Sequence, residues 1–358
     1  MNTARVDAIV KAVLYEGYML YPYRPSAVKN QQRFNFGVVY PRAYSEAQAG
    51  SDAWTMQTEC LIRGDEKTQC HIRVRFLRMV DRSIARVLTP VSTLSALAPE
   101  NIEPVERLEL NGNVYQPWQE AMEEDIAVTE FNLSAVAALP MQWPFRLSAA
   151  TEREPMRDGY GDEHGLIAGI IERRKAGMAG TIEFVAEPLE PSAFRLTVRI
   201  QNTSRMESTQ LITRDAALSR SLVSTHTILE VRNGEFISLV DPPEEFREAA
   251  QACRNVGTWP VLVGEEGQRD AMLSSPIILY DYPQLAPESP GDLFDGAEID
   301  EILMLRIMTL TEDEKREMRQ SDDRARQILE RTESLPEEQF MKLHGALRGL
   351  RNSKPEAP

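Results

Sequence analysis

The sequence predicts an α+β fold in which two largely antiparallel, sandwich-like β regions lie between an N-terminal helix and a C-terminal helical segment. Three observations support this class. Apolar residues recur at helical spacing near both ends of the chain, apolar and polar residues alternate through much of the middle, and glycine-containing turn signals separate the alternating stretches. Strand pairs of this kind favour an antiparallel sheet or a sandwich.

The chain opens with an amphipathic helix and a tyrosine-rich loop. The helix has apolar residues three or four positions apart, at Val6, Ile9, Val10, Val13 and Leu14. Residues 15–25 then hold four tyrosines and two prolines, which rule out a continuous helix. We expect an extended, ordered loop over residues 15–36.

The first β region begins near residue 54. Apolar residues alternate with polar ones over 54–62 and again over 70–76, and the polar residues Gly64 to Lys67 between them predict a hairpin. In that hairpin Cys60 and Cys70 point to the same inner face, opposite one another. An acidic run further along is interpreted as a solvated face: Glu120, Glu123, Glu124 and Asp125.

A second β region follows a polar, glycine-rich stretch at 151–165, which marks a loop or boundary. Alternation resumes over 182–200, Asn233-Gly234 predicts a type I′ hairpin, and residues 243–253 predict a helix. We therefore divide the chain into residues 1–150 (helix, tyrosine-rich loop and first β region), 151–295 (second β region and acidic segment) and 296–353 (C-terminal helices).

Three short helices are predicted at the C-terminal end. The first has apolar residues at helical spacing between Ile299 and Leu310. The next two begin at capping boxes, Thr311 to Glu314 and Ser334 to Glu337, in which the side chains at both ends satisfy backbone N–H groups.

Charge and hydropathy limit the possible classes of function. The formal net charge is -15 and the pI is about 4.9, so the surface repels nucleic-acid phosphates and anionic lipid headgroups. No apolar run is long enough for membrane insertion, and residues 1–7 do not have the features of a signal peptide. We expect a cytoplasmic protein that binds neither nucleic acid nor membrane.

No catalytic or nucleotide-binding motif is present in the sequence. Walker A, GxGxxG and GxSxG patterns are all missing, and the three cysteines do not match a zinc or iron–sulfur spacing. Cys60 and Cys70 with His71 could form part of a soft metal site, but His71 is expected on the opposite face of its strand. Core packing is the simpler interpretation of both thiols. No cofactor is predicted.

The most unusual segment is acidic and proline-rich, and spans residues 274–301. Seven carboxylates fall within residues 281–301, and prolines restrict the backbone between them. The segment could bind a hard cation, present an acidic docking surface or stiffen a long connection. The four apolar residues from Ile277 to Tyr280 are expected to anchor it by burial.

Two blocks of sequence resemble a known but uncharacterised protein family. They are LYEGYMLYPYRPSAVKNQQRFNFG, from Leu14 to Gly37, and SSPIILYDYPQLAPESPGDLFDGAEIDEILMLRIMTLTEDEK, from Ser274 to Lys315. Both are similar to proteins encoded beside actinobacterial-type [NiFe] hydrogenases. The resemblance implies a role in assembling, maturing or supporting a hydrogenase. The paired CxxC motifs of a hydrogenase large subunit are absent from this chain, so it is not the catalytic subunit.

Two hypotheses of function follow. The first is a non-catalytic accessory or assembly protein that contacts a hydrogenase subunit or maturation factor. Its candidate partner-binding residues are Tyr18, Tyr21, Tyr23, Arg24, Asp281, Asp292, Asp295, Glu298, Asp300 and Glu301, although the tyrosines could instead cover the sheet. The second is a maturation enzyme that handles a metal or cofactor through Cys60, Cys70 or a histidine together with carboxylates.

Overall fold

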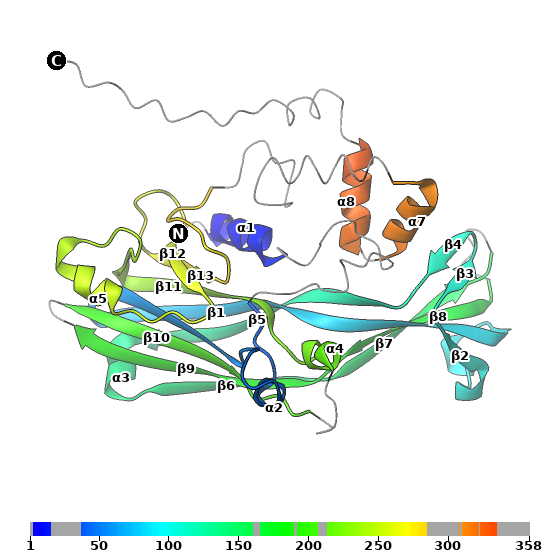
Figure 1. Cartoon of the computed structure of the whole chain (residues 1–358), viewed down its shortest axis with the longest axis horizontal. Helices are drawn as coiled ribbons and strands as arrows, with labels where there is room; N and C mark the ends of the chain where they lie inside the picture. Colours follow the sequence, from blue (N-terminus) through cyan, green and yellow to red (C-terminus); the bar gives the residue numbers. More distant parts are fainter. Residues whose placement is uncertain are drawn as a thin grey trace, which may run out of the picture.

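The computed structural model describes residues 3–15, 37–159, 165–189, 192–206, 213–284, 307, 310–321 and 323–334. Within these ranges the protein is mostly β, with one large antiparallel sheet, a separate two-stranded sheet and a few short helices (Figure 1). The predicted antiparallel β structure is confirmed. The described helices are shorter and fewer than an α+β class implies.

The described strands and helices have the following bounds. The large sheet comprises β1 (Thr55–Val91), β2 (Ile102–Val105), β5 (Trp118–Asn132), β6 (Met141–Leu147), β7 (Ala150–Arg157), β8 (Ile167–Lys175), β9 (Met178–Leu189), β10 (Ala193–Asn202), β11 (Val223–Ile237), β12 (Trp259–Leu262) and β13 (Ala271–Ser275). The small sheet pairs β3 (Leu108–Leu110) with β4 (Asn113–Tyr115). The helices are α1 (Thr3–Leu14), α2 (Arg42–Ala47), α3 (Leu133–Ala138), α4 (Arg214–Leu218), α5 (Arg247–Gln251), α7 (Glu312–Ser321) and α8 (Asp323–Ser334).

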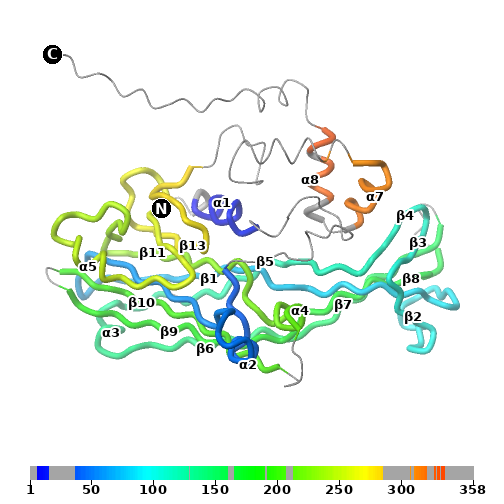
Figure 2. The backbone as a smooth tube through the Cα atoms, viewed as in Figure 1, coloured from blue at the N-terminus to red at the C-terminus, as the bar shows by residue number. Residues whose placement is uncertain are grey.

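Strand β1 organises the sheet and runs along much of its length (Figure 2). It pairs in turn with β10, β11, β5, β8 and β2, so the main strand order is β12-β13-β11-β1-β10-β9-β6. β7 joins the sheet through β8. Because β8, β10 and β11 pair directly with β1, the predicted boundary at residue 150 does not coincide with a break in the sheet.

Both predicted hairpin turns are instead bends in continuing strands. β11 pairs with β1 on both sides of residues 65–68, since Gly64 lies opposite Gly234 and Gln69 lies opposite Arg232. The hydroxyl of Thr68 accepts a hydrogen bond from the Asp65 N–H and donates one to the Asn233 carbonyl, each at 2.8 Å. The predicted hairpins at 64–67 and at Asn233-Gly234 are therefore wrong, because long-range pairing between the two strands overrides the local turn signals.

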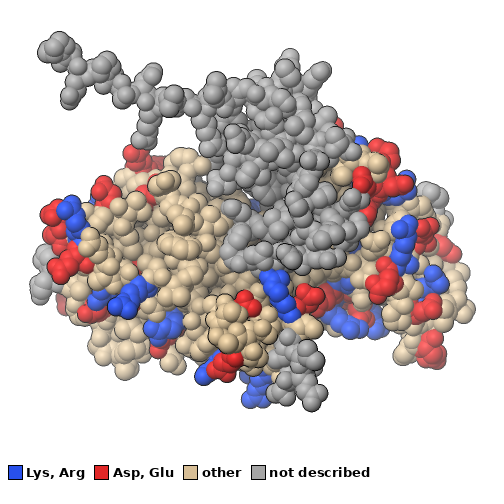
Figure 3. Space-filling view, viewed as in Figure 1, with Lys and Arg blue, Asp and Glu red and all other residues tan. Residues whose placement is uncertain are grey.

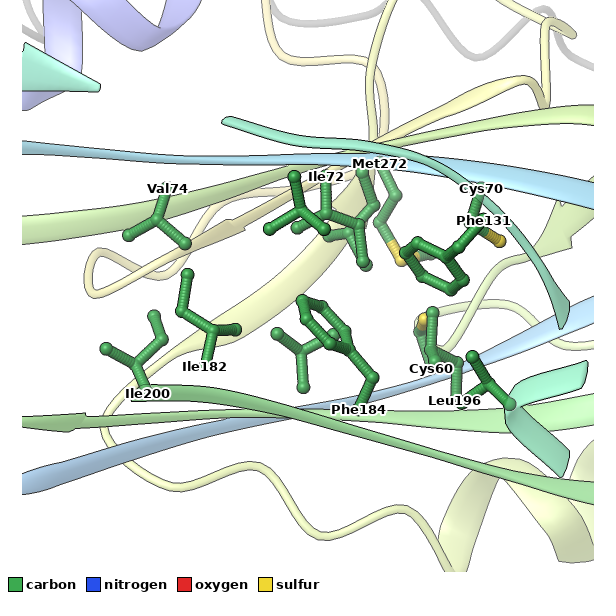
Figure 4. Packing of buried hydrophobic residues seen from close by; sticks show 14 of the residues in the cluster. Cys60, Cys70, Ile72, Val74, Phe131, Ile182, Phe184, Leu196, Ile200 and Met272 are labelled. Carbon is green, nitrogen blue, oxygen red and sulfur yellow. The ribbon is translucent and has the colours of Figure 1, made fainter. Parts of the chain in front are cut away.

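The bend folds the sheet over, so that two layers enclose one apolar core (Figure 4). Ile72 and Val74 of β1 and Phe131 of β5 line one side of this core. Ile182 and Phe184 of β9 face them from the other layer. The rings of Phe131 and Phe184 have centroids 5.2 Å apart and are tilted by 46°, an arrangement that favours edge contacts between aromatic rings.

Helices α1, α7 and α8 lie on the same side of the sheet (Figure 1). The predicted N-terminal helix is confirmed, and its residues Val6, Ile9 and Val10 pack against an apolar cluster of β11, β12 and β13. The first of the two predicted capping boxes is also confirmed, because Thr311 and Glu314 exchange hydrogen bonds where α7 begins. The second box, Ser334 to Glu337, and most of the predicted helix between Ile299 and Leu310 lie outside the described residues. The predicted helix at 243–253 appears as a 3₁₀ turn (Glu244–Phe246) followed by α5.

Four strands that have a single described neighbour carry a proline. Proline lacks the N–H that another strand would need, so it protects an exposed edge from unwanted pairing. The four are Pro104 in β2, Pro144 in β6, Pro155 in β7 and Pro260 in β12. These prolines therefore disfavour the pairing of a further strand at these positions.

Across the described ranges, no helix has both the length and the apolar character that a membrane crossing requires.

Candidate functional site

Most of the predicted partner-binding residues lie outside the part of the chain that the structure describes. This applies to the tyrosine-rich loop and to the later part of the acidic segment, namely Tyr18, Tyr21, Tyr23, Arg24, Asp292, Asp295, Glu298, Asp300 and Glu301. Their role in binding remains a prediction. Asp281 is the member of the set that lies within the described ranges.

Asp281 lies at the outer edge of β12, where both oxygens of its carboxylate accept hydrogen bonds. Oδ1 accepts from the Leu262 N–H at 2.8 Å, and Oδ2 accepts from the Ser238 hydroxyl at 2.5 Å. The N–H of Tyr282 then donates to the Leu262 carbonyl at 2.8 Å. Asp281 and Tyr282 together cover the edge of β12 around Leu262, so this carboxylate supports the fold.

The segment that leads to Asp281 presents apolar side chains to solvent. Ile278 is 74% exposed and Tyr280 is 83% exposed, whereas Leu279 packs against the cluster that holds α1. The expected burial of the whole run from Ile277 to Tyr280 is therefore wrong for two of its residues. Exposure alternates along the segment, as it does in an extended chain whose successive side chains point in opposite directions.

Two further exposed apolar residues are connected to this segment, one through β12 and the other through Ser238. Trp259 begins β12 and lies opposite Ser275, which ends β13 just before the segment. The N–H of Val240 donates to the Ser238 hydroxyl, which also binds Asp281. We refer to Val240, Trp259, Ile278 and Tyr280 as the apolar edge.

Cys60 and Cys70 face the same apolar core, as predicted, but from its two opposite layers (Figure 4). Burial raises the pKa of the Cys70 thiol to about 12, and it raises the pKa of the Cys60 thiol well above its usual value. Both thiols are therefore protonated near neutral pH, whereas metal coordination requires a thiolate. Cys253 is half-buried, and burial raises the pKa of its thiol to about 11.

His71 lies on the face opposite Cys70, as predicted, with its Nδ1 3.1 Å from Oε2 of Glu230. His226 is fully buried, and its Nδ1 donates to the Ser224 carbonyl at 2.7 Å. Its Nε2 has no hydrogen-bond partner within the described part of the chain. Burial lowers the pKa of His226 to about 4, which keeps this ring neutral. Among the residues that the structure describes, no group of three or more His, Cys, Asp or Glu is placed to hold a metal ion.

A cleft of about 770 Å³ lies between the sheet and the helices α1, α7 and α8. We call it the polar cleft, because most of its described lining is charged or polar. In the view of Figure 3, acidic and basic side chains lie next to one another at the end of the molecule that carries α7 and β8. Residues from eight helices and strands line the cleft, among them Lys11, Arg82, Glu120, Arg173 and Arg319.

Glu120 of β5 is the centre of a network of hydrogen bonds in the polar cleft. Its two carboxylate oxygens bind two arginines. Oε1 accepts from Arg82 of β1 at 3.2 Å, and Oε2 accepts from Arg173 of β8 at 2.8 Å. Arg173 also donates to Glu154 of β7 at 2.6 Å. The side chain of Arg82 is only 4% exposed, so its charge depends on these acceptors rather than on water.

The interpretation of the acidic run as a solvated face holds for Glu123 and Asp125, which are exposed, but not for Glu120 and Glu124, which are partly buried. Glu124 accepts from the buried Arg78 at 3.1 Å, and Asp125 binds Arg75 through two hydrogen bonds of 2.8 Å. Glu123 accepts from the Tyr15 hydroxyl at 2.9 Å. The acidic run pairs with the arginines of β1 because the two strands are neighbours, a relationship that neither stretch of sequence reveals alone.

Arg82 also connects the sheet to α7. Its Nη1 donates to the main-chain carbonyl of Gln320 at 3.0 Å, near the end of that helix. Beside this hydrogen bond, Met318 of α7 and Leu329 of α8 are fully buried in a cluster with Leu77 and Met79 of β1. Burying one such side chain stabilises the docked state by roughly 1.5–3 kcal/mol. Among the described side chains of the two helices, Met318 and Leu329 supply the apolar contacts to this cluster.

The described lining of the polar cleft consists mainly of arginine, glutamate and glutamine side chains. Its described lining residues include no His, Cys, Ser or Thr, the side chains that most often act as nucleophiles or move protons near neutral pH. Its arginines and carboxylates are engaged with each other and with backbone carbonyls. Such pairs fix the positions of strands and helices, and they form a surface of mixed charge.

Comparison with known proteins gives no family assignment. No protein-family model matches the chain, and no curated protein matches it significantly.

Proposed function

We propose that this protein is a non-catalytic accessory or assembly protein of a [NiFe] hydrogenase system. In this proposal it acts in the cytoplasm through contacts with a hydrogenase subunit or a maturation factor. The resemblance of residues 14–37 and 274–315 to proteins encoded beside such hydrogenases supports the system. The exposed side chains of Ile278 and Tyr280, which lie in the second block, are the observation that best supports a contact function.

The apolar edge has the properties of a protein-binding surface. Single exposed apolar residues are ordinary, but here two aromatic and two aliphatic side chains are connected through β12 and Ser238. The backbone beneath Ile278 and Tyr280 is fixed by the hydrogen bonds of Asp281 and Tyr282 to Leu262. Exposed aromatic side chains on a fixed backbone lose little conformational entropy when they bind, which favours tyrosine and tryptophan at interfaces.

The folded-over sheet carries the residues of the apolar edge. Its two packed layers support the sandwich-like arrangement that the sequence suggested. The alternative hypothesis, a metal- or cofactor-handling maturation enzyme, combines Cys60, Cys70 or a histidine with carboxylates, and a cysteine ligand would have to be a thiolate. Burial of both thiols in the apolar core opposes that chemistry, so we propose the contact function.

Co-purification with defined variants tests the proposal. A tagged copy is expressed in the native host during hydrogen-oxidising growth, and its partners are identified by mass spectrometry. We expect a hydrogenase subunit or maturation factor with the unmodified protein, and at least a tenfold loss of it with the double variant Ile278→Ser and Tyr280→Ser. Leu88→Ser is the matched control, because Leu88 is also exposed, at 56%, but lies on β1 next to the segment that pairs with β2.

Two results would count against the proposal. One is recovery of the protein without any hydrogenase component. The other is about one equivalent of Ni, Fe or Zn in anaerobically purified protein, which would favour the metal-handling alternative.

A further inference from the structure

We propose that the edge of β5 that faces away from β1 accepts a β-strand of a partner protein. The added strand covers a row of apolar side chains on β6, which we call the β6 row: Met141, Trp143, Phe145 and Leu147. This site is separate from the apolar edge, and it does not rest on the proposed function.

The β6 row points toward the apolar core. Its four members lie opposite four buried residues of β9, namely Phe184, Ile182, Gly180 and Met178. Residues that lie opposite one another on paired strands share a face of the sheet, and the row packs against the core cluster. All four side chains are nevertheless only half-buried. Since complete burial of such side chains is favourable, the row offers apolar surface for a further contact.

The position that would cover the row lies beside β5. Phe131 of β5 and Phe184 of β9 face each other from the two layers, with their ring centroids 5.2 Å apart (Figure 4). β5 therefore lies over β9, and β6 is the next strand after β9 in its own layer. In the other layer, the position over β6 is the one next to β5 on the side away from β1. A strand that pairs with β5 would lie there.

Described contacts bound the row at both ends. At the Met141 end, α3 joins β5 to β6 and packs on β1 and β9. At the Leu147 end, Arg78 of β1 donates to the Ser148 carbonyl at 2.6 Å and to Glu124 of β5 at 3.1 Å. β6 has seven residues between these contacts, which span about 23 Å in an extended strand. A strand of similar length fits the site.

Strand β5 is suited to accept this pairing. It has 15 residues, and β1 is its single described neighbour. The outer edge of such a strand presents N–H and C=O groups with which another strand can pair. The other four strands with one described neighbour carry a proline, whereas residues 118–132 contain none. Pro144 disfavours addition to β6 itself, so the extra strand adds at β5.

Charge selects the kind of strand. Glu123 and Asp125 are exposed on β5, where Asp125 binds Arg75 and Glu123 accepts from the neutral Tyr15 hydroxyl. Two copies of β5 paired about a twofold axis would bring Glu123, Glu124 and Asp125 of both copies together, and like charges in that position repel. A strand with lysine or arginine on its outward face would instead attract them. We therefore assign the edge to a partner strand in which basic and apolar residues alternate.

Peptide binding to the full-length protein tests this pattern. The probe is a fluorescein-labelled peptide of eight residues in which lysine and valine alternate. One control peptide has glutamate in place of lysine, and another has four valines followed by four lysines, which keeps composition and charge. We expect the alternating basic peptide to bind at least tenfold more tightly than either control. Equal binding of the two lysine peptides would overturn the proposal, because charge alone would then explain it.

Hydrogen exchange of the unmodified protein locates the bound peptide. We expect the peptide to slow exchange of the amides in 121–128 at least tenfold and to leave those of β12 unchanged. Binding without slower exchange in β5 would overturn the proposal. Because this measurement needs no variant, a folding defect cannot obscure it.

A matched pair of tryptophan variants tests the β6 row. Trp143→Lys places a charge within the row, and we expect it to weaken binding of the alternating basic peptide at least tenfold. Trp259→Lys is the control, because Trp259 is an exposed tryptophan on β12, in the apolar edge. Equal affinities of the two variants would contradict a site on β6. The co-purification test concerns the apolar edge, so its outcome is independent of this one.

Sedimentation tests the alternative occupant, a second copy of the chain. We expect the sedimentation coefficient of the unmodified protein to change no more than binding of one small peptide requires. A dimer that the alternating basic peptide dissociates would assign the β5 edge to a second copy and would overturn the proposed partner.

Discussion

Arg82 and Arg173 lie directly opposite one another on the neighbouring strands β1 and β8. Like charges in that position repel, and here one of them is almost entirely removed from water. Glu120 resolves the conflict because it reaches from β5, on the other side of β1, and binds both guanidinium groups. One carboxylate therefore joins three strands beneath the helices.

Replacement of this carboxylate should destabilise the protein. Glu120→Gln removes the one carboxylate that binds both arginines and leaves Arg82 without an ion-pair partner among the described contacts, although Arg173 keeps Glu154. We expect a loss of about 2 kcal/mol or more in the free energy of unfolding. Urea denaturation measures it. Glu123→Gln is the control, because Glu123 is exposed and its carboxylate accepts from the neutral Tyr15 hydroxyl rather than from an arginine. Equal effects of the two variants would show that Glu120 has no special role.

The bend of the sheet should depend on the Thr68 hydroxyl. Thr68→Val removes the hydrogen bonds to Asp65 and Asn233 inside a fully buried site, so we expect a loss of roughly 1–3 kcal/mol in unfolding free energy. Thr68→Ser keeps the hydroxyl and should lose less. A valine variant as stable as the serine variant would mean that the hydroxyl does not hold the bend. Thermal or urea unfolding distinguishes them.

Acid should destabilise the protein through His226. Its pKa is about 4 in the folded state, below the ordinary value of 6.5 expected when the chain unfolds. Between these values the unfolded chain binds a proton that the folded protein does not, so stability falls as the pH falls from 6.5 towards 4. The slope for one such group is about 1.4 kcal/mol per pH unit.

The variant His226→Asn cannot titrate in this range, and its unfolding free energy should depend less on pH by about that amount. Urea unfolding at several values between pH 4.5 and 8 measures the difference. Parallel pH profiles for the two proteins would show that His226 is not held neutral by burial.

The two core cysteines should be unreactive in the native protein. At pH 7.5, iodoacetamide should modify neither Cys60 nor Cys70, and it should modify Cys253 slowly, because burial raises the pKa of all three thiols. Denatured protein should react at all three sites. Rapid modification of Cys60 or Cys70 in the native protein, detected by peptide mass spectrometry, would contradict the burial of these thiols in the core. It would also support the metal-handling hypothesis.

The sequence by itself determined the elements that depend on contacts between residues close together in the chain. The spacing of Val6, Ile9 and Val10 specifies an amphipathic helix, and Thr311 with Glu314 specifies where another begins, since these contacts span only a few residues. Alternation likewise identified the strands around Cys60, Cys70 and Ile182, and it placed His71 on the face opposite Cys70. The turn residues at Gly64 and Asn233 marked where the chain changes direction.

Only the tertiary structure decided how those elements combine. Whether Gly64 and Asn233 end strands or bend them depends on the pairing of β1 with β11, whose opposed residues at the bend are more than 150 positions apart. The pairing of Glu120 with Arg82 and Arg173 depends on which strands flank β1. Periodicity tells which face of a strand is apolar, but a charge becomes solvated or buried according to its neighbours in space. For the same reason, the exposure of Ile278 and Tyr280 followed from the hydrogen bonds of Asp281 and Tyr282 to β12, and not from the apolar run itself.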